Sequence, residues 1–157
     1  MKMRIKLLAM DVDGVLTDGM IGFDSEGREI KFFHVRDGMG ICALMEKGVK
    51  VAFISGRFSE VTAHRARDLG VNLVFQGVRD KLGRLVELAL ELGVTSEEVA
   101  YIGDDVNDIP CIEWAGFGVA VADAPAEVRN AASYVTLTRG GHGAVREVCD
   151  LILKSMG

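Results

Sequence analysis

The sequence is poor in the residues that mark several classes of protein. It has two prolines and three cysteines among 157 residues. An apolar share of 49% and a net charge of −5 exclude an intrinsically disordered chain, because disorder goes with low hydrophobicity and high net charge. The 19 glycines follow no collagen period and form no low-complexity tract. The length fits one domain, which we expect to span residues 1–157.

Other absences concern location and partners. Cys42, Cys111 and Cys149 are too far apart for a zinc knuckle or a CxxC redox pair, and we expect free thiols in a reducing cytoplasm. Only the apolar run 7–10 follows the basic start, which is too short for a signal peptide, and no run approaches the length of a membrane span. The acidic balance argues against a nucleic-acid partner.

Short apolar runs alternate with segments of helical period along the chain. The runs predict strands over 5–10, 49–54, 73–75, 99–102, 117–121 and 134–135. The segments between and after them predict helices over 37–47, 59–69, 81–92, 107–114, 126–131 and 143–154. This alternation is typical of an α/β domain with a parallel sheet and helices on both faces.

One segment departs from this alternation. The apolar runs 20–23 and 29–33 flank a turn-forming cluster at 24–28, which predicts a β-hairpin insert over about 18–34. Between the first two polar loops there is room only for this hairpin and one helix, and the stretch 55–81 is too short for a further domain. We therefore expect no large cap domain.

Polar residues follow the predicted strands at the edge where open parallel sheets bind ligands. Asp11 and Asp13 follow the first strand, Ser55 follows the second, and the acidic run 104–108 follows the strand at 99–102. Lys81 opens the clearest amphipathic helix, 81–92. Carboxylates crowded at one edge must be protonated or neutralised by a cation. Magnesium suits such oxygen ligands.

The spacing of Asp11 and Asp13 suggests a division of labour. On extended backbone, residues two apart point to the same side. One carboxylate could attack an electrophile while the other acts as general acid–base. Ser55 and Lys81 could then hold phosphoryl oxygens. Taken singly, the aspartates could be a turn pair, Ser55 a turn residue and Lys81 a surface lysine.

Four motifs in order resemble those of the haloacid dehalogenase superfamily. They are DVDGVLTDG at 11–19, ISGR at 54–57, Lys81, and GDDVND at 103–108. Within that superfamily the chain is similar to the 3-deoxy-D-manno-octulosonate 8-phosphate phosphatases. The details are the extension at 17–19, the hairpin end at 33–38, the run 56–65 and the segment 139–147. The resemblance implies a Rossmann-like core and a role in lipopolysaccharide biosynthesis.

The resemblance also implies roles for the acidic residues. Asp11 would be phosphorylated and would bind Mg²⁺. Asp13 would be the acid–base and would offer its backbone carbonyl to the metal. Asp104 would complete the protein ligands, with Asp108 supporting them, whereas Asp105 could be a solvated neighbour or a further ligand. Related transport ATPases carry threonine in place of Asp13, so a hydrolase is favoured over a pump.

Basic and small residues would bind the substrate. Ser55 and Lys81 would hold the phosphate beside Gly56. Arg57 and Arg65 could reach the carboxylate of the sugar acid, or could form ordinary salt bridges. In the resembling family the hairpins associate into a homotetramer in which each subunit helps to cover the next site. The chain stops at Gly157, so we do not expect the tail-mediated closure of longer relatives.

Two other functions stay open on the sequence. One is a phosphatase for a nine-carbon sialic-type acid 9-phosphate. The other is a non-catalytic oligomerisation module of the same fold, against which the complete set of motif residues argues. A GxGxxA match at 38–43 lacks the acidic residue that a dinucleotide site needs after the next strand, and no Walker loop is present.

Overall fold

The computed structural model describes residues 3–157 and contains one parallel sheet of six strands. The strand order is β5-β4-β1-β6-β7-β8. The strands are β1 (Leu7–Met10), β4 (Lys50–Ile54), β5 (Leu73–Phe75), β6 (Val99–Gly103), β7 (Phe117–Ala120) and β8 (Tyr134–Val135). The predicted α/β class is confirmed.

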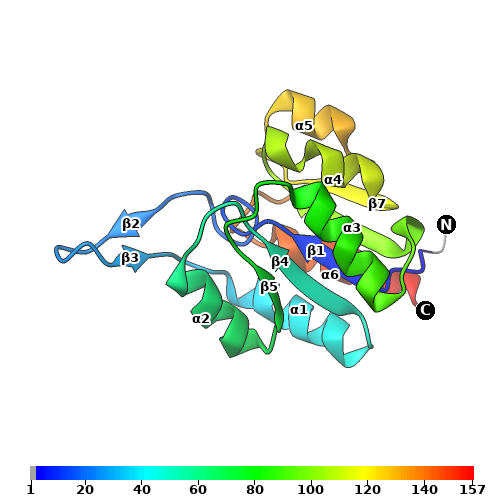
Figure 1. The fold of residues 1–157 in the computed structure, drawn as a ribbon, viewed down its shortest axis with the longest axis horizontal. Coiled ribbons are helices and arrows are strands. Elements are labelled where there is room, and N and C mark those ends of the chain that lie inside the picture. The colour runs from blue at the N-terminus through cyan, green and yellow to red at the C-terminus, as the bar shows by residue number, and fades with distance from the viewer. Residues whose placement is uncertain (1–2) are drawn as a thin grey trace.

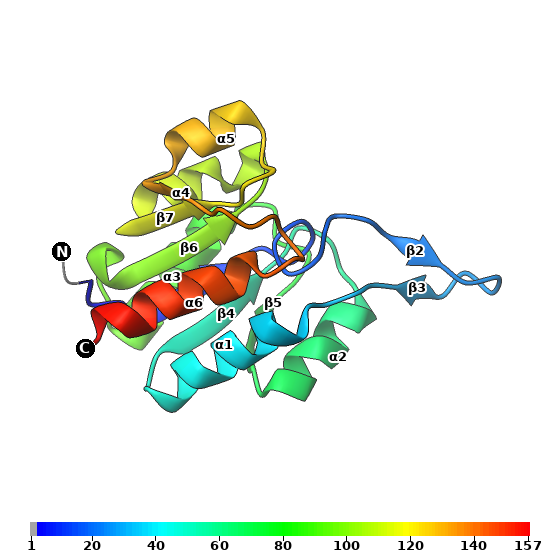
Figure 2. The ribbon, with the colours of Figure 1, turned by 180° about the vertical axis from the view of Figure 1, so that it is seen from behind.

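Helices cover both faces of this sheet (Figures 1 and 2). On one face α1 packs against α6 and α2, and on the other α4 packs against α3 and α5. Their bounds are α1 (Val35–Glu46), α2 (Glu60–Leu69), α3 (Lys81–Leu92), α4 (Ile109–Trp114), α5 (Ala126–Ala131) and α6 (Ala144–Ser155). Because helices lie on both faces, β1 and β6 are buried along their whole length, as their nearly continuous apolar runs predict.

Two helix boundaries differ from the sequence prediction by more than one residue. Helix α1 begins two residues early, because Nδ1 of His34 accepts a hydrogen bond from the Arg36 amide at 3.1 Å and caps the first turn. The helix predicted over 107–114 is divided. Its start is a 3₁₀ turn, Val106–Asp108, and α4 follows from Ile109 with Pro110 in its first turn.

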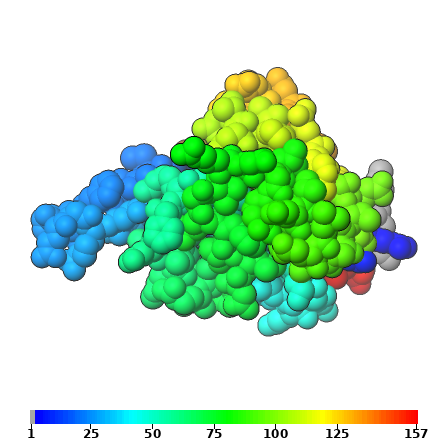
Figure 3. All heavy atoms as spheres, in the orientation of Figure 1, coloured from blue at the N-terminus to red at the C-terminus, as the bar shows by residue number. Residues whose placement is uncertain are grey.

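The predicted hairpin is present and projects from the body of the molecule as an arm (Figure 3). Its paired strands are short, β2 (Gly22–Phe23) and β3 (Glu29–Ile30). Large apolar side chains on it face solvent: Met20 is 73% exposed, Phe23 65% and Phe32 84%. No helix within residues 3–157 is long and apolar enough to cross a membrane.

The loop before α6 packs against the loop that follows β1. The Gly141 amide donates a hydrogen bond to the carbonyl of Val15 at 3.0 Å. A Cβ atom at Gly140 would overlap the carbonyl oxygen of Gly14, so this close approach requires glycine. A segment near the end of the chain therefore fixes the backbone that carries the first acidic motif.

Candidate active site

The carboxyl ends of β1, β4 and β6 form a cleft of about 370 Å³ at the centre of the sheet. The site lies beside β1, where the chain order of the strands reverses and where such folds bind ligands. Its lining includes most of the residues that the sequence predicts to act together. The lining residues are Asp11, Asp13, Gly19, Ser55, Gly56, Arg57, Lys81, Asp104, Asp105 and Asn107.

Lys81 places a positive charge at the floor of the cleft. Its buried ammonium lies 3.2 Å from Oδ1 of Asp11 and 2.9 Å from Oδ1 of Asp108. Burial by itself lowers the pKa of Lys81, but the attraction of these two carboxylates outweighs burial and leaves the pKa raised. Lys81 therefore stays cationic at neutral pH, as a ligand for phosphoryl oxygens must.

Asp108 is fully buried, and both of its carboxylate oxygens are already engaged. Oδ1 accepts hydrogen bonds from Lys81 and, at 2.6 Å, from the hydroxyl of Tyr101. Oδ2 accepts from the amides of Asp104 and Asp105, at 3.0 and 3.3 Å. Asp108 thus holds Lys81 and the turn that carries Asp104, and has little capacity left for a metal ion.

Asp11 and Asp104 bring negative charge to the open side of this arrangement. Oxygens of Asp11, Asp104 and Asp108 all lie within 4.8 Å of one another. The pKa of Asp104 is raised to about 9, first by burial and then by its shared hydrogen bond with Asp11 and the charge of its acidic neighbours. Burial and the charge of Asp108 also raise the pKa of Asp11. Such a pair of carboxylates fits a hard divalent cation.

Gly14 makes this pairing possible. Its φ of +87° lies in the left-handed region, and a Cβ atom there would overlap a carboxylate oxygen of Asp104. Gly14 therefore lets the side chain of Asp104, which follows β6, approach the loop that follows β1.

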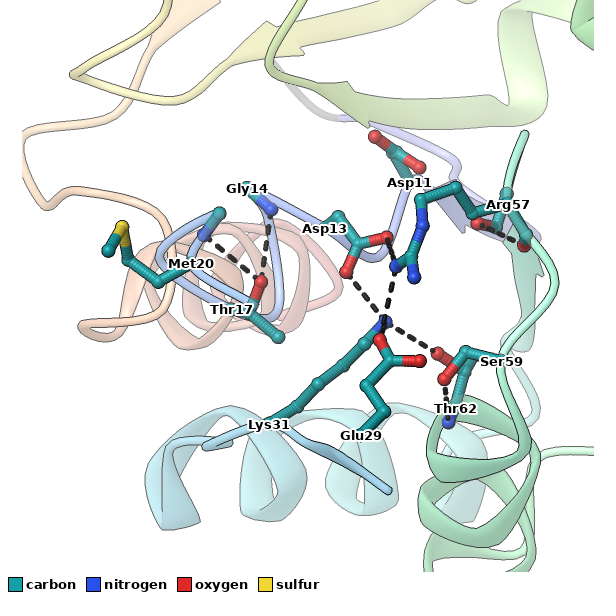
Figure 4. A network of polar contacts seen from close by, with 12 residues as sticks. Asp11, Asp13, Gly14, Thr17, Met20, Glu29, Lys31, Arg57, Ser59 and Thr62 are labelled. Atoms are coloured by element: carbon teal, nitrogen blue, oxygen red, sulfur yellow. Dashed lines mark hydrogen bonds and ion pairs between the residues drawn. The ribbon is translucent and has the colours of Figure 1, made fainter. Parts of the chain in front are cut away.

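The carboxylate of Asp13 points toward Lys31 and Arg57 (Figure 4). Its Oδ1 lies 2.6 Å from the ammonium of Lys31, and its Oδ2 lies 3.3 Å from Nη1 of Arg57. The same Arg57 nitrogen lies 3.1 Å from Oε1 of Glu29. The cation at position 57 is thus paired with two carboxylates of its own chain.

The remaining predicted residues take two different positions. Ser55 is buried at the end of β4, with its hydroxyl donating to the carbonyl of Arg57 at 3.0 Å. Arg65 lies on α2 outside the cleft lining. Its guanidinium stands 5.5 Å from the centroid of the Phe33 ring and pairs with Asp68 at 3.0 Å. Within one chain, the structure does not bring Arg65 to the other site residues.

Sequence reasoning missed the partners that the hairpin supplies. Lys31 and Glu29 contact the Asp13–Arg57 pair, and Thr62 accepts a hydrogen bond from Lys31 at 3.3 Å. One signal was available in the sequence. Lys31 is the one charged residue in the otherwise apolar run from Ile30 to Phe33. Its partner could not be inferred, because the pairing joins residues far apart in the sequence.

Comparison with known proteins gives consistent matches. The model of the haloacid dehalogenase-like hydrolase family matches residues 71–148. The 3-deoxy-D-manno-octulosonate 8-phosphate phosphatase KdsC of Haemophilus influenzae is 48% identical over 154 residues, which cover 98% of this chain and 86% of that protein. The KdsC protein of Escherichia coli K12 is 46% identical, with coverage of 98% and 82%.

Solved structures of similar proteins superpose over almost the whole chain. The phosphatase from Moraxella catarrhalis, solved with magnesium, phosphate and a 3-deoxy-D-manno-octulosonate (KDO) molecule, has a TM-score of 0.94 at 48% identity and covers 97% of this chain and 87% of its own. The cobalt-bound phosphatase from H. influenzae also has a TM-score of 0.94 at 48% identity, with coverage of 98% and 90%.

Proposed function

The chain belongs to the haloacid dehalogenase-like hydrolase family, and we propose from this premise that it hydrolyses 3-deoxy-D-manno-octulosonate 8-phosphate to the free sugar acid and phosphate. It is a phosphoric monoester hydrolase that uses Mg²⁺. One observation carries the chemistry. The carboxylate of Asp11 stands at the end of β1 between the cation Lys81 and the carboxylate of Asp104, in an open cleft. A small sugar acid phosphate is the ligand of that cleft.

We propose the following roles for the residues of the cleft. A carboxylate oxygen of Asp11 attacks phosphorus, and the bond from phosphorus to the sugar oxygen breaks as Asp13 gives that oxygen a proton. Water then attacks the aspartyl-phosphate and loses a proton to Asp13, which releases phosphate and restores Asp11. Lys81 and the hydroxyl of Ser55 hold the phosphoryl oxygens.

The metal would be held by the side chains of Asp11 and Asp104 and the backbone carbonyl of Asp13. The crowding of acidic side chains that raises the pKa of Asp104 supports this donor set. When bound, Mg²⁺ offsets the charge between the anionic phosphate and the anionic nucleophile. Asp108 has its oxygens engaged by Lys81, Tyr101 and backbone amides, which supports a role in holding the site rather than as a ligand.

Substrate recognition beyond the phosphate is proposed for Gly56 and Arg57, which line the cleft. To bind the sugar acid's carboxylate, Arg57 would exchange its contacts with Asp13 and Glu29 for contacts with the ligand. The proposal does not extend to Arg65, whose guanidinium lies over the Phe33 ring and pairs with Asp68.

A substrate panel tests the assignment. Phosphate release with Mg²⁺ is measured for the eight-carbon 8-phosphate, a nine-carbon sialic-type 9-phosphate and neutral sugar phosphates. We expect kcat/KM to favour the eight-carbon acid by at least about tenfold over the nine-carbon acid, and by more over sugars without a carboxylate. Preference for the nine-carbon acid would transfer the assignment to it. Equal turnover of unrelated sugar phosphates would contradict a dedicated sugar-acid enzyme, and no release from any would favour the assembly module.

We also propose that the hairpin joins four copies of the chain. The exposed side chains of Met20, Phe23 and Phe32 lie on a two-stranded ribbon that is marginally stable by itself in water. Light scattering should give a mass four times the 16.9 kDa of one chain. The variant Phe23→Ser Phe32→Ser should dissociate, whereas Leu90→Ser, which changes a 76% exposed leucine on α3, should not. A monomeric wild-type protein would contradict the tetramer.

Two further proposals concern the whole chain. We propose a single hydrolase domain over residues 1–157, supported by the one central sheet and by the packing of α6 against α1. We propose a cytoplasmic location, supported by the three free cysteines, of which Cys111 and Cys149 are buried. In that compartment the reaction would supply the sugar acid for lipopolysaccharide biosynthesis.

A further inference from the structure

The β-hairpin delivers a buried lysine to the edge of the site. Lys31 directly follows β3, and its side chain is 0% exposed. Its ammonium lies 2.6 Å from Oδ1 of Asp13, 3.3 Å from the hydroxyl of Thr62 and 3.5 Å from Oε1 of Glu29 (Figure 4). All the polar groups around this ammonium come from different elements: the loop after β1, the hairpin and α2.

A buried ammonium is costly to maintain. Removing a lysine charge from water carries a desolvation penalty that only close carboxylates and full hydrogen bonding can offset. The ion pairs within the turn of the hairpin, of Arg28 with Asp24 and Glu26, stand at its exposed tip and need no buried lysine. The lysine also does not belong to the residues that line the cleft in the described chain, so direct contact with substrate does not explain it.

The shortest contact of the Lys31 ammonium, at 2.6 Å, is with one oxygen of Asp13. The other oxygen of that carboxylate is bound by Arg57, at the longer distance of 3.3 Å and with the arginine side chain 42% exposed. Arg57 is also the residue proposed to turn toward substrate, so its hold on Asp13 is the one that would be released. Lys31 is enclosed and would keep its hold throughout the reaction.

We infer that Lys31 is a positioning residue that fixes the carboxylate of Asp13 for both of its proton transfers. This inference rests on the proposed function, in which Asp13 protonates the leaving oxygen and later deprotonates water. Lys31 keeps its own protons in both steps and donates a hydrogen bond to Oδ1, while Oδ2 exchanges the proton with the leaving group or water. The hairpin is thereby part of the machinery of its own chain, besides any contact that it makes with a second copy.

The test compares two substrates that differ in their need for a proton donor. The alkoxide released from a sugar phosphate must be protonated as it leaves, whereas p-nitrophenolate leaves without a proton. For Lys31→Met, we expect kcat for the sugar phosphate to fall by about 10- to 100-fold, part of the effect of a complete general acid, with KM within about threefold. With p-nitrophenyl phosphate, the first turnover should keep its wild-type rate while later turnovers slow, because only the hydrolysis of the aspartyl-phosphate needs Asp13.

The signature is therefore a burst of p-nitrophenol that approaches one equivalent per site in the Lys31→Met protein. Lys31→Arg, which restores a cation, should recover part of the lost kcat. Arg28→Met removes a cation from the same hairpin and should behave as wild type. The Arg28 side chain is 72% exposed, and its salt bridges are with Asp24 and Glu26. If Lys31→Met does not fold, Glu29→Gln Lys31→Met removes one charge of each sign and replaces it in the test.

Three results would overturn the inference. The first is an unchanged kcat of Lys31→Met for the sugar phosphate, and the second is an equal fall in the rates of its first and later turnovers of p-nitrophenyl phosphate. The third is no recovery of kcat in Lys31→Arg. Equal loss would mean that Lys31 only supports the fold. Failure of the proposed function is separate, because it would leave the wild-type protein without phosphatase activity on both substrates.

Discussion

Replacing Asp11 with asparagine is expected to reduce phosphate release by at least about a thousandfold, because an amide cannot act as the nucleophile that a carboxylate provides. The folded state should survive the change. Asp11 is buried and faces the charge of Asp108, so its pKa is raised, and loss of its charge relieves repulsion in the cleft. Lys81 keeps its contact with Asp108 at 2.9 Å. Steady-state release from the sugar phosphate and a thermal melt at the same pH measure the two effects.

Asp18→Asn is the matched control. It makes the same chemical change in the same loop, where Oδ1 of Asp18 accepts a hydrogen bond from the Met20 amide and an asparagine oxygen can do the same. This variant should retain activity. If Asp11→Asn releases phosphate at the rate of the control, Asp11 is not the nucleophile.

The second large effect is a pH-dependent requirement for the metal in stability. In the metal-free protein the pKa of Asp104 is raised to about 9 from a usual value of 3.8, by burial first and then by Asp11 and the other acidic neighbours. Between these two values the folded protein binds more protons than the unfolded chain. The contribution of Asp104 to the free energy of unfolding therefore falls as the pH rises from about 4 to about 9.

Mg²⁺ should reverse this loss, because it takes the place of the retained proton. A metal at a hundred times its Kd adds about 2.7 kcal/mol to the free energy of unfolding, which corresponds to a rise in Tm of about 5–10 °C for a chain of this size. We expect a larger rise at about pH 8.5 than at about pH 5.5, since less proton competes. Thermal melts in EDTA and in excess MgCl₂ across this range measure both effects.

Asp104→Asn isolates the contribution of the cluster. It should flatten the pH dependence and remove most of the rise that Mg²⁺ causes, while Asp150→Asn, on the exposed side of α6, should change neither. A residual slope will come from Asp37 on α1, whose pKa is raised by burial. A Tm that increases with pH in EDTA, or an unchanged Mg²⁺ effect in Asp104→Asn, would contradict this account of the site.

Much of the architecture could be predicted from local patterns. The runs that became β1 and β6 are nearly continuous in apolar residues because helices cover both faces of the sheet. The acidic and hydroxyl residues directly follow strands, so the parallel topology alone brings Asp11, Ser55 and Asp104 to one edge. These inferences need only the pattern of apolar residues along the sequence and the direction of the strands.

The parts that could not be predicted depend on pairings between distant side chains. Nothing local shows that Lys31 turns inward to Asp13, or that Arg65 packs on Phe33. The start of α1 was missed because His34 is an uncommon cap, and its role depends on the ring nitrogen accepting from Arg36. Spacing gives the direction of a side chain, whereas its partner is decided by the tertiary packing.

The contact of Gly140 and Gly141 with the loop after β1 limits how early during synthesis the site can form. Synthesis proceeds from the N-terminus, so the loop with Asp11 and Asp13 leaves the ribosome well before the segment that braces it. The Gly141 amide that bonds to Val15 is added 126 residues after Val15 itself. A nascent chain thus carries its nucleophile long before it can hold it still, and catalytic competence has to wait for the segment at 140–141.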